Sequence, residues 1–248
     1  MSFDTVSIDF ISGCDVKAII FDVDGTMADT EDAHRVAFNR AFDQAGLSWH
    51  WSVDEYRDLL SVAGGQERIV HFLHTNTGHS PTSLYDMARS LHQAKTQYYV
   101  QSIEEGSVGL RPGIAELVAQ ATEQRVRLAI ATTTSPANVV ALLSTQLGAK
   151  WANLFEVVED AATAPNKKPC PDVYLNVLAR LGLAAEECMA IEDSFNGLAA
   201  AQRAGIPTVI TRNAYTQHHK FDGAVAVVND LGGVDLAALI QLHTQAIK

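Results

Sequence analysis

Residues 17–26 read K-A-I-I-F-D-V-D-G-T, a stretch that predicts a buried strand leading into a ligand-binding loop. The apolar run stops at two aspartates and a glycine, which is typical of a strand that ends in a turn. A turn at Gly25 would let the carboxylates of Asp22 and Asp24 converge beyond the strand end, where open parallel sheets bind ligands. Two adjacent carboxylates need a cation between them or a shared proton. A simple turn is the alternative, since D-G is a common turn dipeptide.

The composition indicates an acidic globular protein. The chain has 248 residues, 47% of them hydrophobic, and a formal net charge of -11. This charge argues against nucleic acid as a partner, but a small anionic substrate fits if basic residues gather in one cleft. No apolar run reaches transmembrane length, and residues 1–14 lack the pattern of a secretory signal. Cys14, Cys170 and Cys188 have neither metal-site spacing nor an even count, which fits free thiols in the cytoplasm. We expect a cytoplasmic monomer without nucleic-acid or membrane partners.

The order of the predicted elements indicates an α/β fold with a helical insert. After an irregular extension over residues 1–16 and the first strand, helices are predicted at 30–45, 54–60, 66–75 and 82–104, with no convincing strand among them. Further strands are predicted at 126–131, 154–158, 188–191, 206–210 and 224–228, and helices at 112–124, 136–147, 171–182 and 196–205. This alternation predicts a doubly wound, Rossmann-like parallel sheet. We expect a core domain at 15–31 and 109–248, and an inserted α-helical cap domain at 32–108.

Four predicted strands end in polar groups that complement one another. These groups are Asp22 with Asp24, Thr132, Lys168, and Glu192 with Asp193. Each has an ordinary explanation, because helix N-caps, solvated lysines and acidic turns are common. All four fall near the predicted carboxyl ends of strands, however, which favours one shared site.

The residue types of this site indicate phosphoryl transfer. Carboxylates from two strand ends suit a hard divalent ion, and Mg²⁺ in particular. A lysine and a hydroxyl beside them suit a phosphoryl group, whose transfer needs mostly positioning and charge neutralisation. A carboxylate can also attack phosphorus and form an aspartyl phosphate.

Four motifs carry a family resemblance. D-V-D-G-T, the threonine after L-A-I-A, K-P-C-P-D and I-E-D-S-F-N-G-L-A-A-A resemble, in order and spacing, the motifs of the haloacid dehalogenase-like phosphohydrolases. The similarity spans about residues 17–231, and the helical insert resembles the cap of the phosphoglucomutase-like branch. The dehalogenase branch lacks the second aspartate, so Asp24 argues against dehalogenation.

The resemblance implies a role for each motif residue. Asp22 would be the nucleophile, and Asp24 the general acid and base with its main-chain carbonyl on the metal. Thr132 and Lys168 would hold the transferring phosphate. The Mg²⁺ site would comprise Asp22, Asp24, Glu192 and Asp193.

The predicted cap offers further polar residues. Glu31 and His34 follow the Asp loop, and a G-G-Q-E-R segment ends at Arg68. His92 and Lys95 are three residues apart and share a helix face, which is either a binding surface or a solvated one. The two glycines of G-G-Q-E-R suit a close approach of the backbone to a ligand.

The cap segments narrow the substrate by resemblance. T-E-D-A-H, A-G-G-Q-E-R-I, H-Q-A-K-T and A-T-T-T-S-P-A-N-V resemble the CbbY group of this family, phosphatases that act on xylulose-1,5-bisphosphate. On that basis Arg68 and Lys95 are candidates for the non-reacting phosphate, Glu31 and His34 for sugar hydroxyls, and Thr133 and Thr134 for further substrate contacts. Gln66 stands where that group is expected to have a lysine. Arg111 is a weaker candidate.

Three functions remain open at this point. The leading hypothesis is a Mg²⁺-dependent sugar-phosphate phosphatase that converts xylulose-1,5-bisphosphate to xylulose 5-phosphate through an aspartyl phosphate. A β-phosphoglucomutase-like mutase shares the four motifs and the cap type. A binding protein on an inactive scaffold is the third, and the complete set of motifs argues against it.

Overall fold

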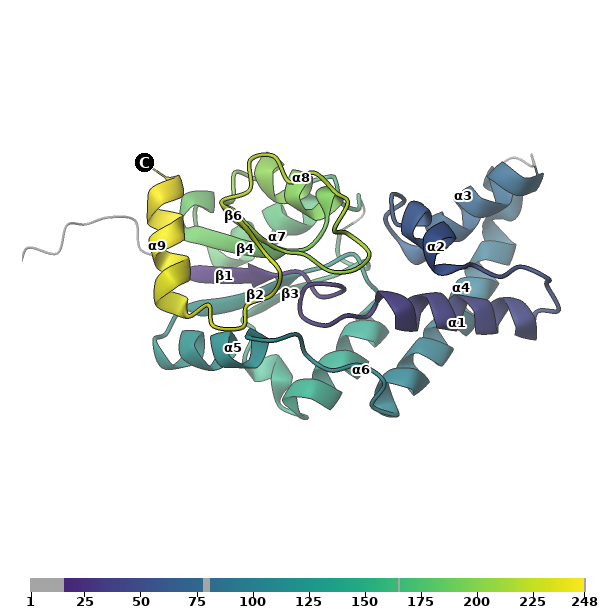
Figure 1. Cartoon of the computed structure of the whole chain (residues 1–248), viewed down its shortest axis with the longest axis horizontal. Coiled ribbons are helices and arrows are strands. Elements are labelled where there is room, and N and C mark those ends of the chain that lie inside the picture. The colour runs from purple at the N-terminus through teal and green to yellow at the C-terminus, as the bar shows by residue number, and fades with distance from the viewer. Residues whose placement is uncertain (1–15, 78–80, 165, 248) are drawn as a thin grey trace, which may run out of the picture.

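The computed structural model describes residues 16–77, 81–164 and 166–247, and shows a parallel sheet with helices on both faces and a helical cap beside it (Figure 1). The extension expected at residues 1–16 lies outside this range except for Val16, and Cys14 lies outside it as well. The other two cysteines are free thiols. Within the described ranges, no helix is long and apolar enough to cross a membrane.

Six parallel strands form the sheet of the described chain, in the order β3-β2-β1-β4-β5-β6. The strands are β1 (Ala18–Phe21), β2 (Arg127–Ala131), β3 (Val157–Glu159), β4 (Cys188–Glu192), β5 (Thr208–Thr211) and β6 (Ala226–Val228). β1 lies between β2 and β4, with Phe21 in register with Ile130 and Ile191. The ends of these three strands therefore meet at one edge, as the sequence predicted.

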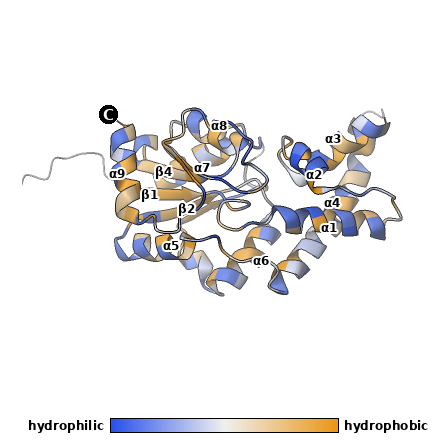
Figure 2. Ribbon diagram, in the orientation of Figure 1, coloured by the Kyte–Doolittle hydropathy of each residue, from blue (hydrophilic) through white to orange (hydrophobic). Residues whose placement is uncertain are grey.

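Helices cover both faces of the sheet, which confirms the doubly wound arrangement. α7 (Asp172–Leu181) and α8 (Phe195–Arg203) pack on one face, and α5 (Ile114–Glu123), α6 (Pro136–Leu147) and α9 (Leu236–Ala246) on the other. Side chains of a strand alternate between the faces. In β1, Ile19 and Phe21 join the α5–α6–α9 side, while Ala18 and Ile20 join the α7–α8 side. The strands are accordingly apolar on both faces (Figure 2).

Most predicted element bounds lie within two residues of the observed ones, and three elements need comment. β3 begins at Val157 and not at residue 154, because Trp151–Asn153 forms a 3-10 turn that Leu154 ends. α5 begins at Ile114, so Pro112 precedes the helix. The carbonyl of Pro112 accepts a hydrogen bond from the N–H of Leu231, which holds Pro112 in the loop before the helix. α9 was not predicted, although Asp235 caps its N-terminus.

The cap consists of α1 (Glu31–Gln44), α2 (Val53–Leu59), α3 (Gly65–Thr77) and α4 (Pro81–Glu104). It has a hydrophobic core of its own, in which the ring of Trp51 lies 4.7 Å from that of Phe38 and 4.9 Å from that of Phe42. Near its C-terminus, α4 adds Tyr99 and Ile103 to the core on the α5–α6–α9 side. α4 thus connects the cap to the core. The domain boundaries between core and cap, at 31/32 and 108/109, stay a prediction.

Candidate active site

Asp22 sits where β1 ends, on the floor of the site. Its N–H donates to the carbonyl of Ile191 at 3.0 Å, so the sheet still holds its backbone. One carboxylate oxygen accepts from Lys168 Nζ at 2.6 Å and the other from Thr26 Oγ1 at 3.2 Å. Gly25 follows with a φ of 78°, and a Cβ on it would lie 2.5 Å from a carboxylate oxygen of Asp193. The left-handed turn and the close approach both require glycine.

Lys168 is held by three acceptors. Its Nζ donates to Asp22 Oδ1 at 2.6 Å, to the carbonyl of Ala131 at 2.8 Å and to Glu192 Oε1 at 2.5 Å. Glu192 Oε1 also accepts from Tyr174 OH at 2.6 Å, and the residue has no exposed surface. Charge-assisted hydrogen bonds of this length are strong and fix direction. Glu192 therefore orients the lysine towards Asp22.

The carboxylates suit a divalent cation. One oxygen each from Asp22, Glu192 and Asp193 lies within 4.8 Å of the others, and all three residues are buried. Burial, together with the neighbouring carboxylates, raises the pKa of Asp22 to about 7 although Lys168 lowers it, and raises the pKa of Asp193 well above its usual range. A hard cation with oxygen ligands would relieve this repulsion, so the donor set fits such an ion.

The side chain of Asp24 is directed elsewhere, to the cap. Its Oδ1 accepts from Thr30 Oγ1 at 2.7 Å and lies 3.0 Å from His34 Nε2. His34 Nδ1 lies 2.7 Å from Lys95 Nζ. Because the ammonium donates to Nδ1, the imidazole proton belongs on Nε2, facing Asp24. The metal contact that the resemblance implies for the main-chain carbonyl of Asp24 stays a prediction.

The protonation states of Asp24, His34 and Lys95 follow from their burial and from the charges beside them. Burial and the Lys95 ammonium lower the pKa of His34 to about 4, so the imidazole is neutral. Burial also lowers the pKa of Lys95 to about 7. Burial alone would raise the pKa of Asp24, but the interactions with His34 and Thr30 hold it below its usual range. Asp24 is thus an ionised carboxylate, as a general base needs to be.

The end of β2 supplies the anion-binding side. Thr132 is 1% exposed, and its Oγ1 accepts from the N–H of Thr134 at 3.3 Å. Ser135 caps α6 directly afterwards, and Asn138 donates to Thr134 Oγ1 at 2.9 Å. The N-terminal end of a helix favours negative charge. Thr133 and Thr134 therefore lie where the sequence analysis expected an anion to bind.

The cap contributes Glu31 and Arg68 to the opposite side. Arg68 donates to the carbonyls of Leu59 at 3.0 Å and Val62 at 3.2 Å, and to Tyr56 OH at 3.0 Å. Tyr56 OH in turn donates to Glu31 Oε2 at 3.1 Å. Burial raises the pKa of Glu31 to about 7, while Arg68 opposes this. These three hydrogen bonds use three of the five N–H groups of Arg68, which lines the cavity.

All these groups face one cavity of about 450 Å³ between the core and the cap. Of the site residues predicted from sequence, all line it except Glu192, which lies behind Lys168, and the weaker candidate Arg111. Sequence analysis missed Lys167, Asn196, Thr216, His219 and Lys220. Lys167 had a local signal, since it precedes Lys168 in the K-K-P motif. The loop after β5, by contrast, carries no motif and reaches the cavity only through the fold.

Arg111, the weaker candidate for substrate binding, is used within the core instead. Its guanidinium donates to the carbonyls of Gly25 at 2.5 Å and Asn229 at 2.6 Å, and to Thr211 Oγ1 at 3.0 Å. It does not line the cavity. Arg111 instead ties the loop after Asp24 to the loops that follow β5 and β6.

Comparison with known proteins agrees with this geometry. A family model described as haloacid dehalogenase-like hydrolase matches residues 16–205. The chain belongs to the haloacid dehalogenase-like hydrolases. Among members of this family, a CbbY protein of Cupriavidus necator is 50% identical over 219 residues, which covers 88% of this chain and 86% of that protein.

Solved structures of this hydrolase family show the same fold. CbbY from Rhodobacter sphaeroides in complex with phosphate is 42% identical, with a TM-score of 0.84 over 90% of this chain and 99% of that one. A mutant of that protein in complex with xylulose-(1,5)bisphosphate is 40% identical, with a TM-score of 0.83 and the same coverage. The resemblance to the CbbY group is confirmed, and the protein is a phosphatase of the haloacid dehalogenase-like family. The roles of the individual site residues stay predictions.

Proposed function

We propose that this protein is a Mg²⁺-dependent sugar-phosphate phosphatase that hydrolyses xylulose-1,5-bisphosphate to xylulose 5-phosphate through an aspartyl phosphate on Asp22. The observation that carries the proposal is the placement of Asp22, buried against Lys168 at the floor of a cavity that the cap covers. A relative 40% identical to this chain binds xylulose-(1,5)bisphosphate in its crystal structure, which supports this substrate.

In the first step, a carboxylate oxygen of Asp22 attacks phosphorus and the bond to the sugar oxygen breaks. Asp24 gives its proton to the leaving sugar oxygen. In the second step, a water molecule attacks the aspartyl phosphate and gives its proton back to Asp24, which releases phosphate and restores Asp22. Asp24 is ionised in the structure, so it must be protonated before it can act as the acid of the first step. An incoming phosphate dianion favours the protonated form, because like charge raises the pKa of a carboxyl group.

The other residues of the core hold the phosphoryl group. Lys168 and Thr132 would contact its oxygens, so the lysine charge is available where negative charge develops. Mg²⁺ would be held by Asp22, Asp193 and Glu192 with the main-chain carbonyl of Asp24, and would supply charge neutralisation at the phosphoryl oxygens.

The cap sets the substrate. Arg68 and Lys95 are proposed to bind the phosphate that is not transferred, Glu31 and His34 the sugar hydroxyls, and Thr133 and Thr134 to add contacts from the core. All six line the cavity. Closure of a cap excludes water and completes such a site, so these residues act only when the cap is in place.

The test is phosphate release with Mg²⁺ from xylulose-1,5-bisphosphate, ribulose-1,5-bisphosphate, β-glucose 1-phosphate and phosphoglycolate. We expect a strong preference for the xylulose bisphosphate, abolished in Asp22→Asn. Asp43→Asn, the same substitution at an exposed position of α1, is the matched control and should retain activity. Conversion of β-glucose 1-phosphate to the 6-phosphate with little free phosphate would instead establish the mutase alternative.

A further inference from the structure

The cavity concentrates positive charge in an acidic protein. Five of its lining residues are lysine or arginine, namely Arg68, Lys95, Lys167, Lys168 and Lys220, whereas the whole chain has a net charge of -11. Four lining residues are acidic, namely Asp22, Asp24, Glu31 and Asp193. The cations therefore outnumber the acids, which suits an anionic substrate.

Two of the five cavity cations already have buried partners in the protein. Lys168 uses its three N–H groups on Asp22, Glu192 and a carbonyl. Lys95 is 3% exposed, contacts His34 and lies over aromatic rings. These two ammonium groups already have buried partners, which a substrate phosphate would have to share rather than replace.

Lys167 is held much more loosely. Its Nζ lies 2.7 Å from Glu67 Oε1, and the side chains are 21% and 43% exposed. The other Glu67 oxygen, Oε2, is buried without a hydrogen-bond partner among the described residues. Partly exposed ion pairs contribute little to stability, so Lys167 can exchange this carboxylate for another anion more readily than Lys168 or Lys95 can exchange their buried partners.

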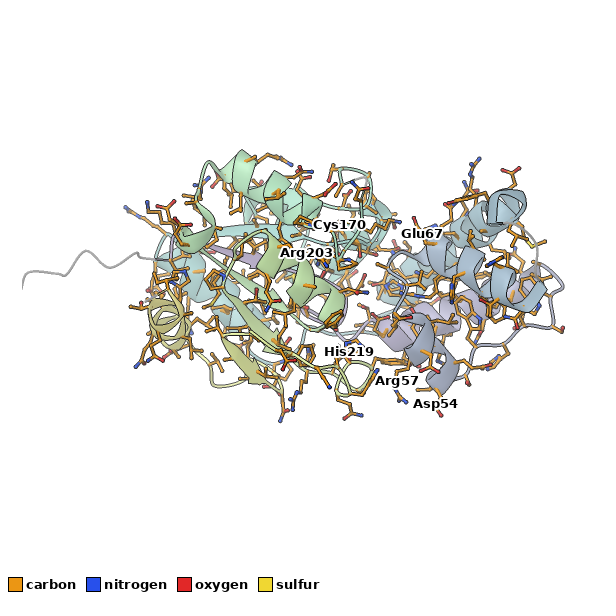
Figure 3. All side chains as sticks on the ribbon, turned by 90° about the horizontal axis from the view of Figure 1, so that it is seen from above. Asp54, Arg57, Glu67, Cys170, Arg203 and His219 are labelled. Carbon is orange, nitrogen blue, oxygen red and sulfur yellow. The ribbon has the colours of Figure 1, made fainter. Side chains whose placement is uncertain are left out.

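The ion pair crosses from the cap to the core beside an anion-favouring helix end. Glu67 lies in the first turn of α3, on the side of the cap that faces the core (Figure 3). A Cβ on Gly64 would lie 2.6 Å from Lys167 Nζ, and a Cβ on Gly65 would lie 2.7 Å from His92 Nε2. Both glycines line the cavity, which brings the N-terminal N–H groups of this 13-residue helix next to the lysine.

The neighbouring side chains add no competing cation at this point. Burial, with Lys95 and Lys167 nearby, lowers the pKa of His92 to about 4, so its imidazole is neutral. Gln66, the second residue of α3, is uncharged. Lys167 is therefore a partly exposed cation at this end of the cavity, which the buried Arg68 and Lys95 also line.

We propose that Lys167 is a specificity-determining residue that binds the non-transferred phosphate of the substrate, and that Glu67 holds the lysine until this phosphate replaces it. This inference rests on the proposed function, in which the substrate is a bisphosphate. A phosphate dianion carries more charge than the carboxylate it displaces and also accepts from the N-terminus of α3.

The experiment compares Lys167→Met, Lys167→Arg and Glu67→Gln in the full-length Mg²⁺ enzyme, with Lys150→Met as an exposed control. The two substrates are xylulose-1,5-bisphosphate and p-nitrophenyl phosphate, which has no second phosphate. We expect Lys167→Met to raise KM for the bisphosphate about 10-fold or more, since a contact to a charged group is lost. The kcat/KM for the bisphosphate divided by that for p-nitrophenyl phosphate should fall by the same factor in Lys167→Met. Lys167→Arg should keep most of the wild-type ratio.

Glu67→Gln separates binding from a purely structural role of the ion pair. If Lys167 binds phosphate, removing its competing carboxylate lowers KM for the bisphosphate. If the pair only holds the cap closed, Glu67→Gln impairs both substrates as much as Lys167→Met does, and the inference is overturned. An unchanged ratio in Lys167→Met, with a wild type that prefers the bisphosphate, overturns this inference alone. A wild type without bisphosphate turnover overturns the proposed function and the inference together.

Discussion

Replacing Arg111 by methionine should destabilise the protein strongly, because the guanidinium joins the Asp loop to two loops beyond the sheet. It donates to the carbonyl of Gly25 at 2.5 Å, to the carbonyl and hydroxyl of Thr211 at 3.2 and 3.0 Å, and to the carbonyl of Asn229 at 2.6 Å. It also contacts the carbonyl of Arg212. Arg111 is only 7% exposed.

The loss of folding stability in Arg111→Met depends on which of the former acceptors water can reach. The carbonyls of Gly25 and Thr211 are in buried contacts, and losing each contact should cost about 1–3 kcal/mol. The carbonyl of Gly25 would keep only a 3.3 Å hydrogen bond from Asn213 Nδ2. The acceptors on Arg212 and Asn229 are in partly buried contacts, so water replaces much of what is lost. We expect a total of about 3–4 kcal/mol, a large part of the roughly 5–15 kcal/mol of a typical native protein.

The measurement is urea unfolding followed by circular dichroism, with Arg111→Lys and Arg89→Met beside Arg111→Met. Lysine donates from one point and cannot span the separate acceptors, so Arg111→Lys should recover less than half of the loss. Arg89 has a side chain that is 62% exposed, and its replacement should cost below about 0.5 kcal/mol. A loss in Arg111→Met within about 1 kcal/mol of that control would refute the reasoning. A selective rise of KM for the bisphosphate would restore Arg111 as a substrate ligand.

Three more predictions concern the site. Mg²⁺ should raise the Tm of the wild type in differential scanning fluorimetry, because it relieves the repulsion between the carboxylates. Asp193→Asn should remove most of this rise in Tm. An equal rise in the variant would contradict the metal assignment. Gly197→Ala should lower kcat at least 10-fold, because the new Cβ would lie 1.8 Å from a carboxylate oxygen of Glu192. Glu192 is the residue that orients Lys168. A normal kcat in this variant would show that Glu192 is dispensable. The folded chain keeps a proton on Glu31 up to a pKa of about 7, whereas the unfolded chain releases it near 4.5, so this group costs stability as pH rises between these values. Glu31→Gln should therefore gain about 1–3 kcal/mol over the wild type on going from pH 5 to pH 8 in urea melts, and no gain would contradict the shift.

Sequence alone was sufficient where a local pattern has one structural solution. The run before Asp22 is a buried strand because its residues are apolar on both faces and it ends at a glycine. Asp193 lies near Asp22 because the neighbouring parallel strands β4 and β1 present their carboxyl ends at one edge. Lys168 reaches Asp22 from the segment that follows β3. Motif order and strand topology together therefore place the catalytic floor, and the helical periodicity between residues 53 and 104 predicts the cap.

Tertiary structure decided what each polar side chain is free to do. No local pattern shows that Arg111 is used up by carbonyls from distant loops, or that Lys167 contacts a cap residue 100 positions away. The neutral state of His34 likewise depends on burial and on Lys95, which lies on another helix. Hydrogen bonds and charge interactions of this kind act over a few ångströms in space and are independent of distance along the chain. The sequence therefore determines which chemical groups are present and roughly where the sheet presents them, and only the packing of cap on core determines which of them remain available for a substrate.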